Sequence, residues 1–103
     1  MRQELQDRND YLRLIYDTAK EHNPVSPVSI WFGLSRYGKL KNGKVEIDET
    51  ESGGYILGEQ LGLDRDQVAA IVKYFHERGY LDATLGMKKF RITNEGQDYI
   101  EGL

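Results

Sequence analysis

The side chains with the most specific hydrogen-bonding chemistry stand together in the stretch Leu63–Leu81, LDRDQVAAIVKYFHERGYL. Arg65 carries a planar fork of donors, the amide of Gln67 both donates and accepts, and the carboxylate of Asp66 only accepts. These groups match base edges in the major groove of DNA, because arginine pairs with guanine, glutamine with adenine and aspartate with cytosine. The stretch therefore offers sequence-dependent hydrogen bonding to duplex DNA, and Arg65 can equally bind phosphate.

Other positions of the same stretch suit a helix that lies close to DNA. Ala69 and Ala70 are slim enough to permit close approach to a groove and to touch a thymine methyl group. Lys73 and Tyr74 are placed to contact the phosphate backbone. The predicted DNA-contacting residues of this helix are Arg65, Asp66, Gln67, Ala69, Ala70, Lys73 and Tyr74.

A capped amphipathic helix must position these side chains. Asp64 is a favourable N-cap, and Gln67 three residues later completes a capping box. Gly79 supplies the positive φ that ends the helix, which we expect to run Asp64–Arg78. One apolar stripe faces the core and comprises Val68, Ile71, Val72 and Phe75.

The side of the helix opposite this stripe mixes charges. Lys73 stands there with Asp66 and Glu77, and both carboxylates would face the phosphates of bound DNA. The helix is therefore sterically suited to a groove but electrostatically less so.

Two antiparallel strands are expected after this helix, at about Tyr80–Ala83 and Lys88–Ile92, with a turn near Gly86. These strands carry three basic residues, Lys88, Lys89 and Arg91. Their positive charge predicts that the strands rest on the phosphate backbone; a solvated surface is the alternative. Thr93 is expected to cap a final helix that begins at Asn94.

The first helix is predicted over residues 4–22. Its apolar face comprises Leu5, Leu12, Ile15 and Ala19. Tyr11, Leu14 and Tyr16 widen this face enough for packing on two sides. Asn23-Pro24 ends the helix, because the residue before a proline is pushed out of the helical region.

The segment Asn23–Ser52 is predicted to be an ordered accessory element, because its aromatic residues are too apolar for a free loop. Ser26 and Pro27 suit the start of a short helix. One face of this helix would hold Ile30, Trp31, Leu34 and Tyr37. The β-prone sequence SIWF leaves a strand as the alternative. The sequence KLKNGKVEI predicts a hairpin that turns at Asn42-Gly43, and DETESGG predicts a loop. Accessory backbone contacts are expected from Arg36, Lys39, Lys41 and Lys44, with a solvated surface as the alternative.

The order of these elements resembles a winged helix-turn-helix domain. The sequence LGEQLGL resembles the second helix and turn of that superfamily, in which Leu57 and Leu61 would be buried. Gly58 would then pack against the third helix and Gly62 would make the turn. The sequence RITNEGQDYI resembles the second wing strand and closing helix of small regulators of the MarR and PadR groups. The resemblance covers residues 54–100, whereas nearly 30 residues between Asn23 and Ser52 replace a connection that is usually short.

The resemblance implies a mostly helical α+β fold, a winged helix-turn-helix with a three-helix core plus a two-stranded wing. Residues 23–52 would be inserted between the first and second helices of a single domain, residues 1–103. It also implies a sequence-specific DNA-binding transcriptional regulator whose partner is double-stranded DNA. Such a regulator is expected to be a homodimer, because one domain covers too few base pairs for genomic specificity. The apolar width of the first helix and the sequence IWFGL would provide the dimer surface.

Composition bounds the function further. The chain of 103 residues contains no Cys and no apolar run long enough for a membrane span, which predicts a cytoplasmic protein with no membrane partner. His22 and His76 lack ligand spacing, and the serines lack a partnering base, so we expect no metal, no cofactor and no enzyme activity. The net charge of −3 favours a second hypothesis, in which a winged helix binds a protein partner and not DNA.

Overall fold

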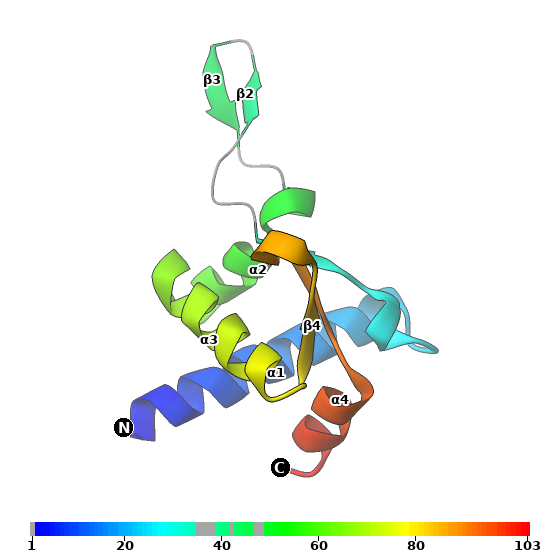
Figure 1. Cartoon of the computed structure of the whole chain (residues 1–103). Helices are drawn as coiled ribbons and strands as arrows, with labels where there is room; N and C mark the ends of the chain where they lie inside the picture. The colour runs from blue at the N-terminus through cyan, green and yellow to red at the C-terminus, as the bar shows by residue number, and fades with distance from the viewer. Residues whose placement is uncertain (1, 35–38, 42, 47–48) are drawn as a thin grey trace.

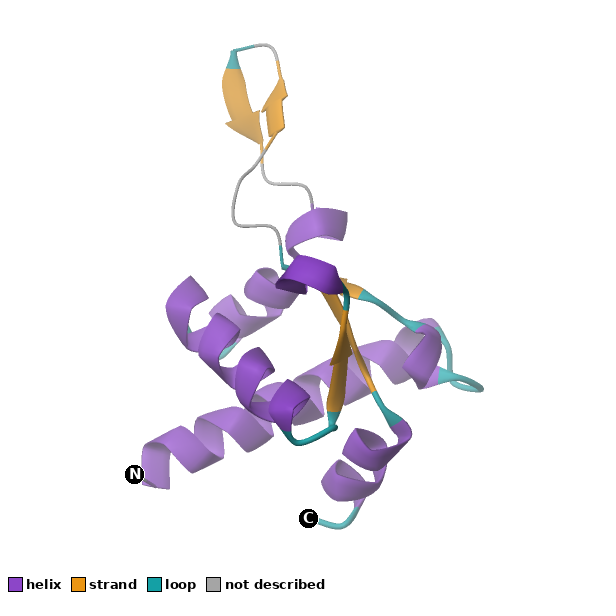
Figure 2. Cartoon of the chain, in the orientation of Figure 1, coloured by secondary structure: helices purple, strands orange, loops and turns teal. Residues whose placement is uncertain are grey.

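Four α-helices and a small three-stranded antiparallel sheet make up the body of the computed structural model, which describes residues 2–34, 39–41, 43–46 and 49–103 (Figures 1 and 2). The helices are α1 Arg2–His22, α2 Glu49–Gln60, α3 Arg65–Glu77 and α4 Asn94–Glu101. The strands are β1 Phe32–Gly33, β2 Lys39–Lys41, β3 Lys44–Glu46, β4 Leu81–Ala83 and β5 Lys89–Ile92. Two short 3-10 turns are η1 Pro27–Ser29 and η2 Leu85–Met87. The mostly helical α+β prediction is confirmed.

The sheet has the order β1-β5-β4, so the last strand lies between the other two. Phe90 of β5 stands opposite Phe32 of β1 on one side and Ala83 of β4 on the other. Its side chain is fully buried and stacks on the Phe32 ring at a centroid distance of 5.5 Å. This arrangement is compatible with a winged helix but is not specific to it.

The first helix forms as predicted, and its buried side holds Tyr11, Leu12, Ile15 and Ala19. The prediction that Leu5 belongs to that side is wrong, because its side chain is 52% exposed. The N-terminal turns of α1 extend past the rest of the body (Figure 1), so fewer side chains are there to cover Leu5.

The short helix predicted in the segment after α1 is mostly wrong. Only Pro27–Ser29 is helical, and the strand alternative holds for Phe32–Gly33. The helical face does not form because Phe32 and Leu34 enter the core, while Trp31 beside them is 41% exposed. Tyr37 lies outside the described residues.

The β2–β3 hairpin forms as predicted, and Gly43 at its turn has a φ of +77°. Figure 1 shows this hairpin standing away from the helices and the three-stranded sheet.

The second helix begins earlier than its sequence predicts, because Glu49 to Gly54 are helical and do not form a loop. Gly54 serves close packing: a Cβ there would come within 2.7 Å of Phe90 Cε1 and 2.9 Å of the Gly33 carbonyl oxygen. The expectation for Leu61 is also wrong, since its side chain is 37% exposed. Leu63 is buried instead, because its N–H donates to the Gly58 carbonyl and turns the chain back toward the core. Leu57 is partly buried and packs against the core.

The helix α3 has the predicted phase, with Val68, Ile71, Val72 and Phe75 buried. Gly58 lies directly against it, because a Cβ on Gly58 would collide with the Val68 Cγ2 methyl group. Gly79 ends the helix with a φ of +79°, as predicted. The two expected strands and the Thr93 cap of α4 also form, with the Thr93 hydroxyl accepting from the Gly96 N–H.

Hydrogen bonds tie α4 to α1. The Tyr99 hydroxyl donates to Asn9 Oδ1 at 2.7 Å, and the Tyr16 hydroxyl donates to the Glu101 carboxylate. The Glu101 contact raises the pKa of Tyr16 to about 12, because the carboxylate accepts a proton that the ionised phenol lacks. Tyr11 joins α1 to α2 by donating to the Gly54 carbonyl at 2.7 Å, and burial raises the pKa of its phenol.

We predict that Gly58→Ala destabilises the fold by about 1–3 kcal/mol, because the new methyl group must displace Val68. Gly53→Ala is the matched control in the same helix, since a Cβ there meets nothing within 4 Å. It should stabilise α2 by about 0.5–1 kcal/mol through lower backbone entropy of the unfolded chain. Urea unfolding of both variants measures the difference, and equal stabilities would contradict the close approach of α2 to α3.

A second prediction concerns Phe75, whose side chain is 1% exposed. Phe75→Ala should cost about 3–5 kcal/mol, as large truncations in a core do. Leu85→Ala, at a side chain that is 98% exposed, should change the free energy of unfolding by less than about 0.5 kcal/mol. A loss below about 1 kcal/mol for Phe75→Ala would show that the phase of α3 is wrong.

Candidate nucleic-acid interface

A complete capping box fixes the start of α3. The Asp64 Oδ1 atom accepts from the Gln67 N–H at 2.8 Å, and Gln67 Oε1 accepts from the Asp64 N–H at 2.9 Å. The side-chain oxygen of Gln67 therefore already serves the helix, while its NH2 group has no part in the box. Paired recognition of adenine uses both ends of the amide, so Gln67 Oε1 would have to accept a second hydrogen bond or leave the box.

The outer face of α3, opposite its buried stripe, consists of Asp66, Ala70, Lys73 and Glu77, all of them exposed. Gln67 is also exposed, whereas Arg65, Ala69 and Tyr74 are half-buried at the edges. The structure thus brings the seven sequence-predicted residues to one side of one helix. The outer face carries two carboxylates and one ammonium group, as the sequence indicated.

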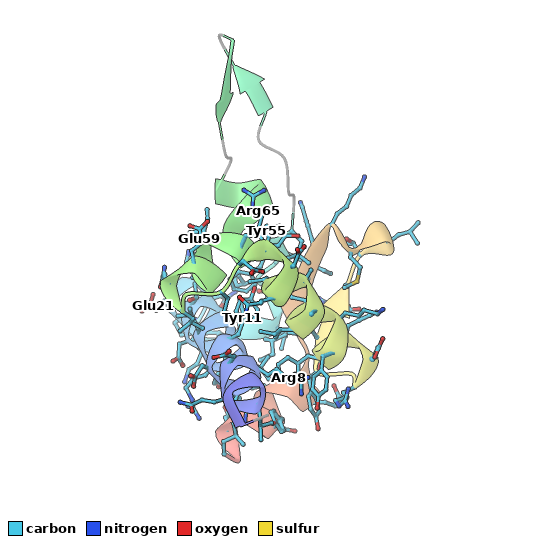
Figure 3. The ribbon with its side chains drawn as sticks, turned by 90° about the vertical axis from the view of Figure 1, so that its left-hand side faces the viewer. Arg8, Tyr11, Glu21, Tyr55, Glu59 and Arg65 are labelled. Atoms are coloured by element: carbon cyan, nitrogen blue, oxygen red, sulfur yellow. The ribbon has the colours of Figure 1, made fainter. Side chains whose placement is uncertain are left out.

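Arg65 lies at the junction of α2 and α3. Its guanidinium carbon is 5.5 Å from the centre of the Tyr55 ring of α2, and Figure 3 shows the two side chains close to Glu59. A guanidinium group that stacks on an aromatic ring is held in place while its N–H groups stay directed outward in its plane.

Tyr74 is placed between two arginines that the sequence did not single out. The guanidinium carbon of Arg8 is 3.9 Å from the centre of the Tyr74 ring, and that of Arg78 is 3.5 Å away. Arg78 Nη1 also donates to the Tyr74 carbonyl at 3.3 Å. The spacing of four residues on one helix was a signal for Arg78, whereas Arg8 depends on where α1 crosses α3.

The basic side chains of the β4–β5 hairpin, Leu81–Ile92, differ in exposure and in pairing. Lys88 and Lys89 are exposed, as a contact with phosphate requires. Arg91 pairs with Asp82 across the strands, at 3.2 Å between Nη2 and Oδ2, and its guanidinium group lies 4.8 Å from the Trp31 ring centre. The positive charge available on this hairpin is therefore mainly that of the two lysines.

The accessory basic residues fall on the β2–β3 hairpin or beside it. Lys41 stands opposite Lys44 in the register, and Lys39 opposite Glu46. Arg36 and the side chains of the three lysines lie outside the part of the chain that the structure describes.

Two hollows border these elements. A crevice of 180 Å³ separates α1 from α3 and is lined by Asp7, Arg8, Leu63, Gln67, Ala70 and Ile71. A wider hollow of 410 Å³, between the C-terminal turns of α1, β1 and α2, contains Trp31 and His22. Within the described ranges, no three His, Asp or Glu side chains gather as a metal site would need. None of the helices described is long and apolar enough to span a membrane.

Comparisons with family models, with curated proteins and with solved structures found no match for this chain.

We predict that Asp64→Ala lowers the free energy of unfolding by about 0.5–2 kcal/mol, because the Gln67 N–H loses its acceptor. Asp98→Ala is the control, at an exposed aspartate of α4 whose backbone carbonyl, which the substitution keeps, accepts from the C-cap N–H of Gly102, and it should change stability by less than about 0.5 kcal/mol. Thermal and urea unfolding of the two variants would show whether the capping box contributes, and indistinguishable variants would show that it does not.

Proposed function

We propose that this protein is a DNA-binding transcriptional regulator of the winged helix-turn-helix class. In this proposal α3 enters the major groove and the β4–β5 hairpin is the wing along the phosphate backbone. The observation that carries the proposal is the slim exposed side of α3 standing next to a hairpin with two exposed lysines. The strand order β1-β5-β4 and the packing of Gly58 on α3 agree with this class.

In the proposed complex, Gln67 and Arg65 read bases, whereas Lys88 and Lys89 bind phosphates. Ala69 and Ala70 permit the close approach that such contacts need. The Asp82 partner of Arg91 reduces what that arginine contributes to a polyanion, so the two lysines dominate.

The proposed regulator acts as a homodimer in the cytoplasm. Much of the apolar surface that the sequence offered for a dimer lies inside the monomer, since Tyr11, Tyr16, Phe32 and Leu34 are buried. Trp31 remains the most exposed aromatic side chain of the IWFGL segment.

A second candidate function is a protein-interaction module with the same architecture. The exposure of both Asp66 and Glu77 on the outer face of α3 favours it, because a basic partner surface would match these carboxylates. Measurement of DNA binding distinguishes these two candidate functions.

Binding to a fluorescent duplex, followed by anisotropy over a series of KCl concentrations, tests the DNA proposal. Lys88→Ala with Lys89→Ala should weaken binding to all sequences alike and reduce the slope of log K against log [KCl] by about two. Gln67→Ala should instead change the preference between sequences, and Asp66→Asn should raise general affinity by removing a charge that faces phosphate. Lys20→Ala on the exposed surface of α1 is the control.

Normal binding by the double lysine variant, together with unchanged affinity of Asp66→Asn, would contradict the DNA proposal. The protein-interaction function would then replace it.

A further inference from the structure

The two arginines on Tyr74 form a cluster that joins α1 to α3. Both guanidinium carbons lie within 4 Å of one ring centre. Two such groups cannot share one face of a ring at that distance without overlap, so they occupy its opposite faces. We call Arg8, Tyr74 and Arg78 the Tyr74 stack.

Stacking on the ring uses the faces of the two guanidinium groups and not their hydrogen-bonding edges. The N–H donors of a guanidinium group point outward in its own plane. One of these donors, on Arg78, reaches the Tyr74 carbonyl, and Arg78 is exposed at the end of α3. Arg8 is half-buried where α1 meets α3.

The position of the Tyr74 stack relates it to the proposed DNA surface. Arg8 lines the crevice whose other wall contains Gln67 and Ala70, two of the residues expected to face bases. In Figure 1 the N-terminal turns of α1 lie on one side of α3 and the β4–β5 hairpin lies on the other. Figure 3 shows Arg8 beneath α3, on the side where α1 approaches it. Basic side chains thus lie on both sides of α3, with Lys88 and Lys89 on one side and the two arginines of the Tyr74 stack on the other.

We propose that Arg8 and Arg78, held by Tyr74, form a second phosphate-binding site for duplex DNA on the side of α3 away from the β4–β5 hairpin. This inference rests on the proposed function and extends it, because it makes the first helix part of the interface. A helix in the major groove lies between two phosphate backbones. The lysines of the hairpin contact one of them, and the Tyr74 stack contacts the other. Asp7 and Glu77 are the sequence neighbours of the two arginines, and Asp7 lines the same crevice as Arg8, so the stack binds phosphate through directed guanidinium hydrogen bonds as well as through charge.

The test uses the full chain and the same fluorescent duplex over the KCl series. Arg8→Ala and Arg78→Ala should each reduce the salt slope by about one, and the double variant by about two. Arg13→Ala is the matched control, because Arg13 is an arginine of α1 that reaches the Ile100 carbonyl of α4 and not Tyr74. Its salt slope should equal that of the unmodified chain. Circular dichroism and thermal unfolding establish that each variant is folded.

Arginine modification of the unmutated chain provides a measurement that needs no variant. Phenylglyoxal should modify Arg8 and Arg78 more slowly when saturating duplex is present, while Arg13 should react at the same rate with and without DNA. Mass spectrometry of the digested protein quantifies each site.

The outcomes separate the two proposals. If the unmutated chain binds duplex and the double lysine variant binds weakly, but the Arg8 and Arg78 variants keep the full slope and DNA does not protect either arginine, the Tyr74 stack is a structural link only. If the unmutated chain binds no duplex at low salt, the proposed function and this inference both fail.

Discussion

The burial of Phe90 is the constraint on which most of the arrangement depends. Its ring lies on the Phe32 ring of β1, beside Tyr11 of α1 at a centroid distance of 6.4 Å, and against the backbone of α2 at Gly54. One side chain thus joins the sheet to two helices. Because neighbouring residues of a strand point to opposite faces, burial of Phe90 directs Lys89 outward. The exposure of Lys89 in the proposed interface therefore follows from the burial of Phe90.

Local features of the fold could be predicted from the sequence because their causes lie within a few residues. The capping box of α3 needs only Asp64 and Gln67, and the turn after α3 needs only Gly79. The buried stripe of α3 follows from the helical period. For the same reason, the helical period alone assigns the seven candidate residues of α3 to one side of that helix.

Features that depend on contacts between distant elements could not be predicted in this way. The sequence around Gly53 and Gly54 looks like a loop, but both glycines lie within α2. Glycine is needed at position 54 because a larger residue would collide with Phe90 and Gly33, which are far away in the sequence. Trp31, apolar by type, remains partly exposed because the strand that follows it turns Phe32 inward. No sequence pattern indicated the contact of Arg8 with Tyr74, because the two residues are 66 positions apart and only the crossing of α1 over α3 brings them together.

The hydrogen bonds between α1 and α4 determine when this core can be completed. Tyr16 and Glu101 are 85 positions apart, Arg13 and Ile100 are 87 apart, and Asn9 and Tyr99 are 90 apart. Ile100 itself is 1% exposed, so α4 supplies part of the core. Contacts of such long sequence separation form late and slow the overall rate of folding. A chain emerging from the ribosome can therefore form α1 and α3 early, but the inner face of α1 stays partly uncovered until the residues of α4 have been synthesised.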